Sequence, residues 1–152
     1  MSAILDLQIA CQATDIPSEK EIQICLDCVL QDRQLGEQEI TVRIVDIAES
    51  QQLNHQYRAK NNATNVLSFP FEAPPEITLN LLGDLVICAE IVKLEAKQQN
   101  KPESAHWAHM VVHGTLHLLG FDHINDDDAE HMEELEISIL NKLSIDDPYQ
   151  NH

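Results

Sequence analysis

Hydrophobic and polar residues alternate over several short stretches of the chain, which is the pattern of half-buried β-strands. Apolar residues occupy nearly every second position in two of these stretches and form short runs in two others. We therefore expect four strands, at residues 4–9, 40–47, 65–69 and 84–88. The segment between the last two strands contains Pro74 and Pro75, so we expect a loop there, with a short extended piece at residues 77–81.

Between these strands, apolar residues recur every three to four positions, which is the spacing of one face of an α-helix. The first such segment begins with Ser18, and Glu21 can complete a capping box three positions later. Pro102 fits the first turn of a later helix. We expect five helices, at residues 18–31, 48–57, 89–99 and 102–118 and from about Asn125, the last with Met132, Leu135 and Ile139 on its buried side.

Length and composition predict one compact domain spanning residues 1–152. With 43% hydrophobic residues, a chain of this length can bury its own core without disulfides, so we expect its four cysteines to be reduced. Cys25 and Cys28 form a C-x-x-C pair, but the pair lies in the middle of a predicted helix and no second pair completes a zinc site. Core packing is therefore the favoured role of this pair.

The first residues of the chain do not have the pattern expected of a signal peptide. Its first ten residues contain no Lys or Arg, and polar residues interrupt their apolar stretch. We therefore expect neither a signal peptide nor a membrane span, and a cytoplasmic location.

The chain has a formal charge of −17, from 26 acidic and 9 basic residues. Such a charge repels a polyanion at long range, so composition alone does not suggest RNA binding. Screening acts over about 8 Å at physiological salt, so a local basic cluster in a groove can still hold a phosphate. Many acidic residues are expected on the solvated start and outer face of the last helix, where they can also meet basic proteins: Asp126, Asp127, Asp128, Glu130, Glu133, Glu134 and Glu136.

Three of the eight histidines have a spacing that fits one metal ion. His113 and His117 are four residues apart on a predicted helix, so their imidazoles share one face. Gly120 can adopt the left-handed conformation that ends a helix, which lets the chain turn back and brings His123 to the same ion. Three neutral imidazoles leave the ion its full charge and one position for water, as in catalytic zinc sites. The alternative is a closed structural site with a fourth ligand such as Asp122 or another histidine.

The same spacing occurs in the H-E-x-x-H-x-x-G-x-x-H signature of metzincin peptidases, with Gly114 in place of the glutamate. Because that glutamate is the general base and glycine cannot accept a proton, the sequence disfavours a peptidase while the metal site remains. His106, His109 and Asp122 are candidates for hydrogen bonds that orient the ligands. The alternatives are histidines packed near the helix surface and an aspartate that stabilises the turn.

Two basic residues, Arg58 and Lys60, lie near the end of the second predicted helix. The planar guanidinium of Arg58 fits a phosphate and stays charged, so it can neutralise charge at a phosphoryl centre. Two cations at a helix C-terminus also interact favourably with the helix dipole, so the pair does not by itself indicate a phosphate site.

Three segments together resemble the YbeY endoribonuclease family in order and spacing: residues 53–70, 82–87 and 113–123. The resemblance implies an α+β fold in which a mixed four-stranded sheet packs with about five helices. It also implies a metal-bearing cleft formed by the helix and turn near the C-terminal third. Phe121 stands where the family usually has tyrosine and Asn61 where aspartate is common, so no role should rest on a hydroxyl or carboxylate there.

The resemblance further implies the metal ligands His113, His117 and His123, the catalytic residues Arg58 and His113, and one zinc ion. The implied activity is single-strand-specific endoribonuclease cleavage, in maturation of the 3′ end of small-subunit (16S) rRNA and in ribosome quality control. The implied partners are RNA, the small ribosomal subunit and basic ribosomal proteins.

A mechanism follows from these parts as a hypothesis. Water bound to zinc would supply hydroxide at phosphorus while Arg58 stabilises the added negative charge, or the metal would instead activate the 2′-hydroxyl of the RNA. Imidazole ligands also suit copper or nickel. Two other functions remain open: a hydrolase of another substrate, such as a peptidase, and a non-catalytic ribosome assembly factor with a zinc site.

Overall fold

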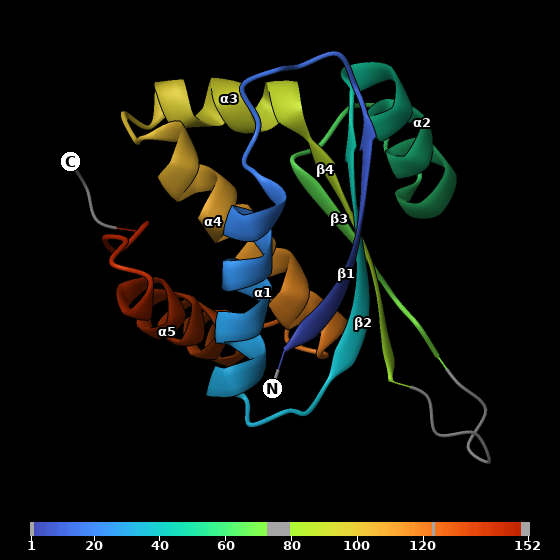
Figure 1. The fold of residues 1–152 in the computed structure, drawn as a ribbon. Coiled ribbons are helices and arrows are strands. Elements are labelled where there is room, and N and C mark those ends of the chain that lie inside the picture. Colours follow the sequence, from blue (N-terminus) through green and yellow to red (C-terminus); the bar gives the residue numbers. More distant parts are fainter. Residues whose placement is uncertain (1, 73–79, 123, 150–152) are drawn as a thin grey trace.

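The computed structural model describes residues 2–72, 80–122 and 124–149, which form one four-stranded sheet and five helices (Figure 1). The strands are β1 (Ala3–Ala10), β2 (Gln38–Val45), β3 (Val66–Pro70) and β4 (Leu81–Cys88). The helices are α1 (Glu19–Asp32), α2 (Ile47–Arg58), α3 (Ala89–Gln98), α4 (Glu103–Leu118) and α5 (Asp126–Lys142). None of the helices within these ranges has the length and hydrophobicity of a membrane span.

The sheet is mixed, with the strand order β1-β2-β4-β3. Strands β1, β2 and β4 are parallel, and β3 pairs antiparallel with β4 at one edge. Parallel neighbours need a crossover connection, and α1 provides it between β1 and β2. Together with the five helices, this sheet confirms the predicted α+β fold class.

Helix α4 is the central element of the helical layer. Helices α1, α4 and α5 lie on one side of the sheet and α2 on the other (Figure 1). Helix α4 packs against α1, α3, α5 and the strands β3 and β4. Most of its side chains are therefore buried, among them Trp107, Val112 and Leu116. This packing makes α4 a firmly held support for the histidines that it carries.

The opposite face of the sheet carries a small second cluster, which Leu53 of α2 covers. Helix α2 begins directly after β2 because the side chain of Asp46 accepts a hydrogen bond from the backbone N–H of Glu49, at 3.1 Å. The prediction that Ile47 ends the second strand is therefore wrong. Ile47 is the first residue of α2 and is 40% exposed.

Other local predictions agree with the structure more closely. The capping box of Ser18 and Glu21 at the start of α1 is confirmed. Strand β4 begins at Leu81, three residues before the predicted start. Residues 77–79 of the extended piece predicted at 77–81 lie outside the described residues, and residue 80 precedes the strand.

All four cysteines are free thiols. Burial raises the pKa of the Cys25 thiol to about 12, so Cys25 keeps its proton and is a poor metal ligand. The thiol of Cys28 donates a hydrogen bond to the carbonyl of Ile139, at 3.8 Å. The C-x-x-C pair thus takes part in the packing of α1, as predicted.

Candidate active site

The four-residue spacing of His113 and His117 on α4 brings their rings together. The two Nε2 atoms are 3.1 Å apart and the ring centroids 4.5 Å apart. Two nitrogens bound to a tetrahedral zinc at about 2.0–2.1 Å lie about 3.3–3.4 Å from each other. The pair therefore fits two neighbouring positions of one zinc ion.

A turn at Gly120 follows α4. The backbone N–H of Gly120 donates to the carbonyl of His117 at 3.0 Å, and that of Phe121 donates to the carbonyl of Leu116 at 3.1 Å. The φ angle of Gly120 is 99°, which favours glycine although a Cβ would meet no atom within 4 Å. The predicted left-handed glycine is confirmed. His123, the third predicted ligand, lies outside the described residues, so its binding to metal stays a prediction.

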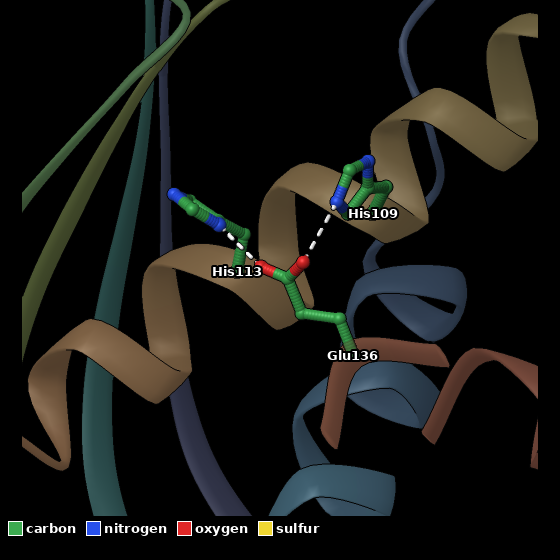
Figure 2. Close-up of side chains that lie close together, drawn as sticks. All are labelled: His109, His113 and Glu136. Carbon is green, nitrogen blue, oxygen red and sulfur yellow. Dashed lines mark hydrogen bonds and ion pairs between the residues drawn. The ribbon is translucent and has the colours of Figure 1, made fainter. Parts of the chain in front are cut away.

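The carboxylate of Glu136 extends from α5 to a position between the rings of His109 and His113 (Figure 2). Its Oε1 is hydrogen-bonded to Nδ1 of His113, and its Oε2 lies 3.3 Å from Nε2 of His109 and accepts from the hydroxyl of Tyr149. One ligand atom from each of His109, His113 and Glu136 lies within 4.8 Å of the others, so the group could hold a metal ion. Glu136 is fully buried, at 0% exposure, so the prediction that it lies on a solvated outer face is wrong.

The electrostatics of this group keep Glu136 ionised. Burial raises the pKa of its carboxyl, but hydrogen bonds from His109 and His113 outweigh burial and lower the pKa of Glu136 well below its ordinary value. Tyr149 is 42% exposed, but desolvation of its phenol and the hydrogen bond to Glu136 raise its pKa, so the hydroxyl stays protonated and donates this hydrogen bond. Burial also lowers the pKa of His109, which favours the neutral ring.

The burial of Glu136 follows from the helical period of α5. Met132, Glu136, Ile139 and Leu140 have the spacing of one helix face, and all four are fully buried. Most of the other acidic residues of this segment are exposed, as predicted. The position of Glu136 among apolar neighbours was therefore the signal that could have identified it, and the high local content of acidic residues concealed it.

His106 and His109 are both buried on α4 and have different partners. Nε2 of His106 lies 2.9 Å from Oε1 of Glu95 in α3, and the same carboxylate accepts from the side-chain amide of Asn65, at 3.1 Å. His106 thus links α4 to α3 and to the start of β3. His109 instead contacts Glu136.

A cavity of about 710 Å³ is lined by His113 and His117 and by residues of α2 and β3. Arg58, at the end of α2, lines the same cavity, and so does the exposed residue Asp122. Arg58 is exposed, and within the described parts of the chain it forms no ion pair with a carboxylate. Three of the predicted site residues, Arg58, His113 and His117, therefore share one cleft.

Buried polar contacts fix the loop that follows Arg58. Asn54, which is 1% exposed, donates from its side-chain amide to the carbonyl of Asn62 at 2.8 Å. The hydroxyl of Ser50 donates to the carbonyl of Thr64 and accepts from its N–H, each at 3.0 Å. These bonds tie the loop to α2, so the backbone that carries Arg58 has a defined place at the cleft.

Gly114 faces the sheet and not the cleft. A Cβ at this position would lie 2.8 Å from Cδ2 of Leu85 and 3.1 Å from Cγ2 of Val66. The hydroxyl of Ser68 donates to the carbonyl of Gly114, at 3.0 Å. Because α4 lies this close to the sheet, a glutamate cannot occupy the position without displacing the core, which accounts for a glycine there.

Comparison with known proteins identifies one family and a related fold. A family model described as endoribonuclease YbeY matches residues 7–144, which is most of the chain. Among solved structures, the solution structure of TM1509 from Thermotoga maritima is similar, with a TM-score of 0.61 and 24% sequence identity. The similarity covers 91% of this chain and 89% of that chain. At this level of identity the likeness indicates a shared fold.

Proposed function

This chain belongs to the YbeY endoribonuclease family, and we propose that it is a zinc-dependent, single-strand-specific endoribonuclease. We further propose that it acts in maturation of the 3′ end of small-subunit rRNA and in ribosome quality control, in the cytoplasm. The observation that supports the activity best is the shared cleft, in which the paired Nε2 atoms of His113 and His117 and the guanidinium of Arg58 line one cavity.

His113, His117 and the predicted ligand His123 would hold the metal ion. Neutral imidazoles that share a face of α4 suit zinc, and they suit nickel or copper as well. A bound zinc ion would act as a Lewis acid and would lower the pKa of its bound water to about 7. The cleft leaves room beside the pair for a substrate group, as an open catalytic site requires.

Arg58 would bind the scissile phosphate. Its guanidinium is exposed in the cleft and can direct two N–H groups at phosphate oxygens. Negative charge on these oxygens increases as phosphorus is attacked, so a fixed cation there stabilises the transition state more than the ground state.

Aromatic residues of the same cleft support a single-stranded substrate. Tyr57 is 60% exposed and its ring packs edge-on against Phe69, with centroids 4.9 Å apart. Unpaired bases of single-stranded RNA stack on such rings, whereas bases within a duplex are not available for stacking.

The test combines metal analysis with cleavage of a structured and an unstructured RNA. We expect about one zinc ion per chain and cleavage of the unstructured RNA only. His117→Ala should lose both zinc and cleavage, because two imidazoles bind far more weakly than three. His55→Ala is the matched control, since His55 is an exposed histidine of α2 outside the cleft.

Three outcomes would contradict the proposal in different ways. Full zinc content in His117→Ala would overturn the ligand assignment. A zinc-loaded wild type that cleaves peptides and not RNA would indicate a hydrolase of another class. Two results together would indicate an assembly factor: a zinc-loaded wild type that cleaves neither peptides nor RNA, and normal rRNA maturation by a folded, metal-free variant.

A further inference from the structure

The two ring nitrogens of His113 have different surroundings. Nδ1 is hydrogen-bonded to Oε1 of Glu136, whereas Nε2 lies 3.1 Å from Nε2 of His117. Figure 2 shows one nitrogen of the His113 ring directed at the carboxylate and the other directed away from it. Glu136 and His109 do not line the cavity that contains Arg58. The ring thus joins a buried polar group to an open cleft.

We propose that Glu136 is a positioning residue that holds His113 in the tautomer with its proton on Nδ1, so that the lone pair of Nε2 faces the cleft. The inference rests on the proposed function in one respect, namely that His113 binds the metal through Nε2. A carboxylate can only accept a hydrogen bond, so the N–H of the pair belongs to Nδ1 of His113. A neutral imidazole has one N–H, so Nε2 is then the atom available for a metal.

The other carboxylate oxygen of Glu136 is also occupied. Oε2 lies 3.3 Å from Nε2 of His109 and accepts from the hydroxyl of Tyr149, and these two donors are themselves 3.3 Å apart. They come from α4 and from the segment after α5, while Glu136 comes from α5 itself. With Oε2 held on one side, Oε1 is fixed toward His113. The carboxylate therefore has little freedom to leave the ring that it orients.

A metal ion bound by His109, His113 and Glu136 themselves is the competing interpretation, since their ligand atoms lie within 4.8 Å of one another. Two observations favour the positioning role. Glu136 is 0% exposed and lies outside the cleft, so an ion there would be separated from Arg58 and from any substrate in the cleft. Both oxygens of Glu136 already accept hydrogen bonds, as expected of a carboxylate behind a ligating histidine.

The first measurement needs neither a variant nor a metal. Long-range ¹H–¹⁵N NMR correlations of the metal-free wild type report which ring nitrogen of each histidine carries the proton. We expect the Nδ1–H tautomer for His113. The Nε2–H tautomer would overturn the inference.

The second measurement is zinc affinity, by competition with a chelator and without RNA. Glu136→Gln keeps the shape of the side chain and removes its charge, and we expect zinc to bind about 10- to 100-fold more weakly. X-ray absorption of the loaded variant should find the same number of nitrogen and oxygen ligands as in wild type. Tyr149→Phe, which removes only the hydroxyl, should weaken binding in the same direction by a smaller factor. Glu134→Gln is the matched control, because Glu134 is exposed on the same helix.

Two results would overturn the inference. The first is that Glu136→Gln binds zinc as tightly as the control Glu134→Gln does. The second is that Glu136→Gln and His109→Ala lose most of their zinc while His117→Ala keeps it. That pattern would place the ion between His109, His113 and Glu136. If Glu136→Gln does not fold, Tyr149→Phe and the tautomer of His113 decide the question. Absence of RNA cleavage by a zinc-loaded wild type would contradict the proposed function and leave this inference standing.

Discussion

A guanidinium cannot bind zinc, so Arg58 can act on a reaction in the cleft only through its charge and its hydrogen bonds. It is exposed, lines the cavity beside His113 and His117, and forms no ion pair with the carboxylates of the described residues. Its substitution therefore separates chemistry from metal binding. No other side chain of the proposed site allows that separation as simply, because the histidines affect both.

We predict that Arg58→Ala leaves folding and zinc content intact and lowers single-turnover cleavage of single-stranded RNA by a factor on the order of 10². Arg58→Lys should recover part of the rate, because lysine keeps the charge but not the planar fork. Lys97→Ala is the control for the loss of one positive charge, since Lys97 is exposed on α3 and outside the cleft. Wild-type rates in Arg58→Ala would remove the arginine from the mechanism.

The pattern of apolar residues, together with the capping-box and proline signals, predicted every helix and strand of the described structure. It did not predict where elements end when distant contacts decide. Leu81 is extended because it pairs with Glu39 of β2, and no local pattern records that pairing. Ile47 is apolar at a strand-like position, yet the capping bond of Asp46 places it in α2. The end of an element thus depends on partners that a one-dimensional pattern does not contain.

The same limit applies to the candidate site. Residues of one helix turn, such as His113 and His117, could be predicted as a pair because four residues span one turn of a helix. Glu136 comes from α5, and its contact with His113 depends on how α4 and α5 pack. Arg58 comes from α2, which lies on the other side of the sheet from α4 (Figure 1). No spacing along the chain relates Arg58 to the histidines, so only the resemblance to a family associated them.

Strands β3 and β4 approach each other closely at Gly83, which lies opposite Pro70. Its φ is 147°, and a Cβ would lie 2.4 Å from the carbonyl oxygen of Phe69 and 2.9 Å from Cδ2 of Leu118. We expect Gly83→Ala to lower the free energy of unfolding by about 2–4 kcal/mol, from backbone strain and the clash together. The measurement is denaturant unfolding. Because Phe69 and Pro70 line the cleft, cleavage should fall as well.

Gly36→Ala is the control for that prediction. A Cβ at Gly36 would meet no atom within 4 Å, and its φ lies outside the left-handed region, so alanine should change stability by less than about 1 kcal/mol. Equal stability of the two variants would mean that the strands shift to accommodate a side chain at Gly83. The close approach of β3 and β4 would then be of no energetic importance.

The whole molecule carries a formal charge of −17, which opposes the approach of an RNA at long range. The proposed contacts with RNA are local ones, made within the cleft by Arg58 and the aromatic residues beside it. Long-range repulsion is screened by salt more strongly than contacts within a few ångströms. The salt dependence of the reaction therefore reports which of the two effects controls association.

We predict that kcat/KM for a short single-stranded RNA rises when ionic strength increases from about 0.01 M to about 0.15 M, since the screening length falls from about 30 Å to about 8 Å. Nucleases that attract RNA through a large basic surface show the opposite trend, because salt weakens their phosphate contacts. The double variant Asp126→Asn/Asp127→Asn removes two exposed charges at the start of α5 and should show a smaller rise. Zinc content, measured at both salt concentrations, excludes loss of metal as the cause. A steep fall of kcat/KM over the whole range would show that local attraction in the cleft outweighs the charge of the molecule, and that the acidic surface does not hinder RNA.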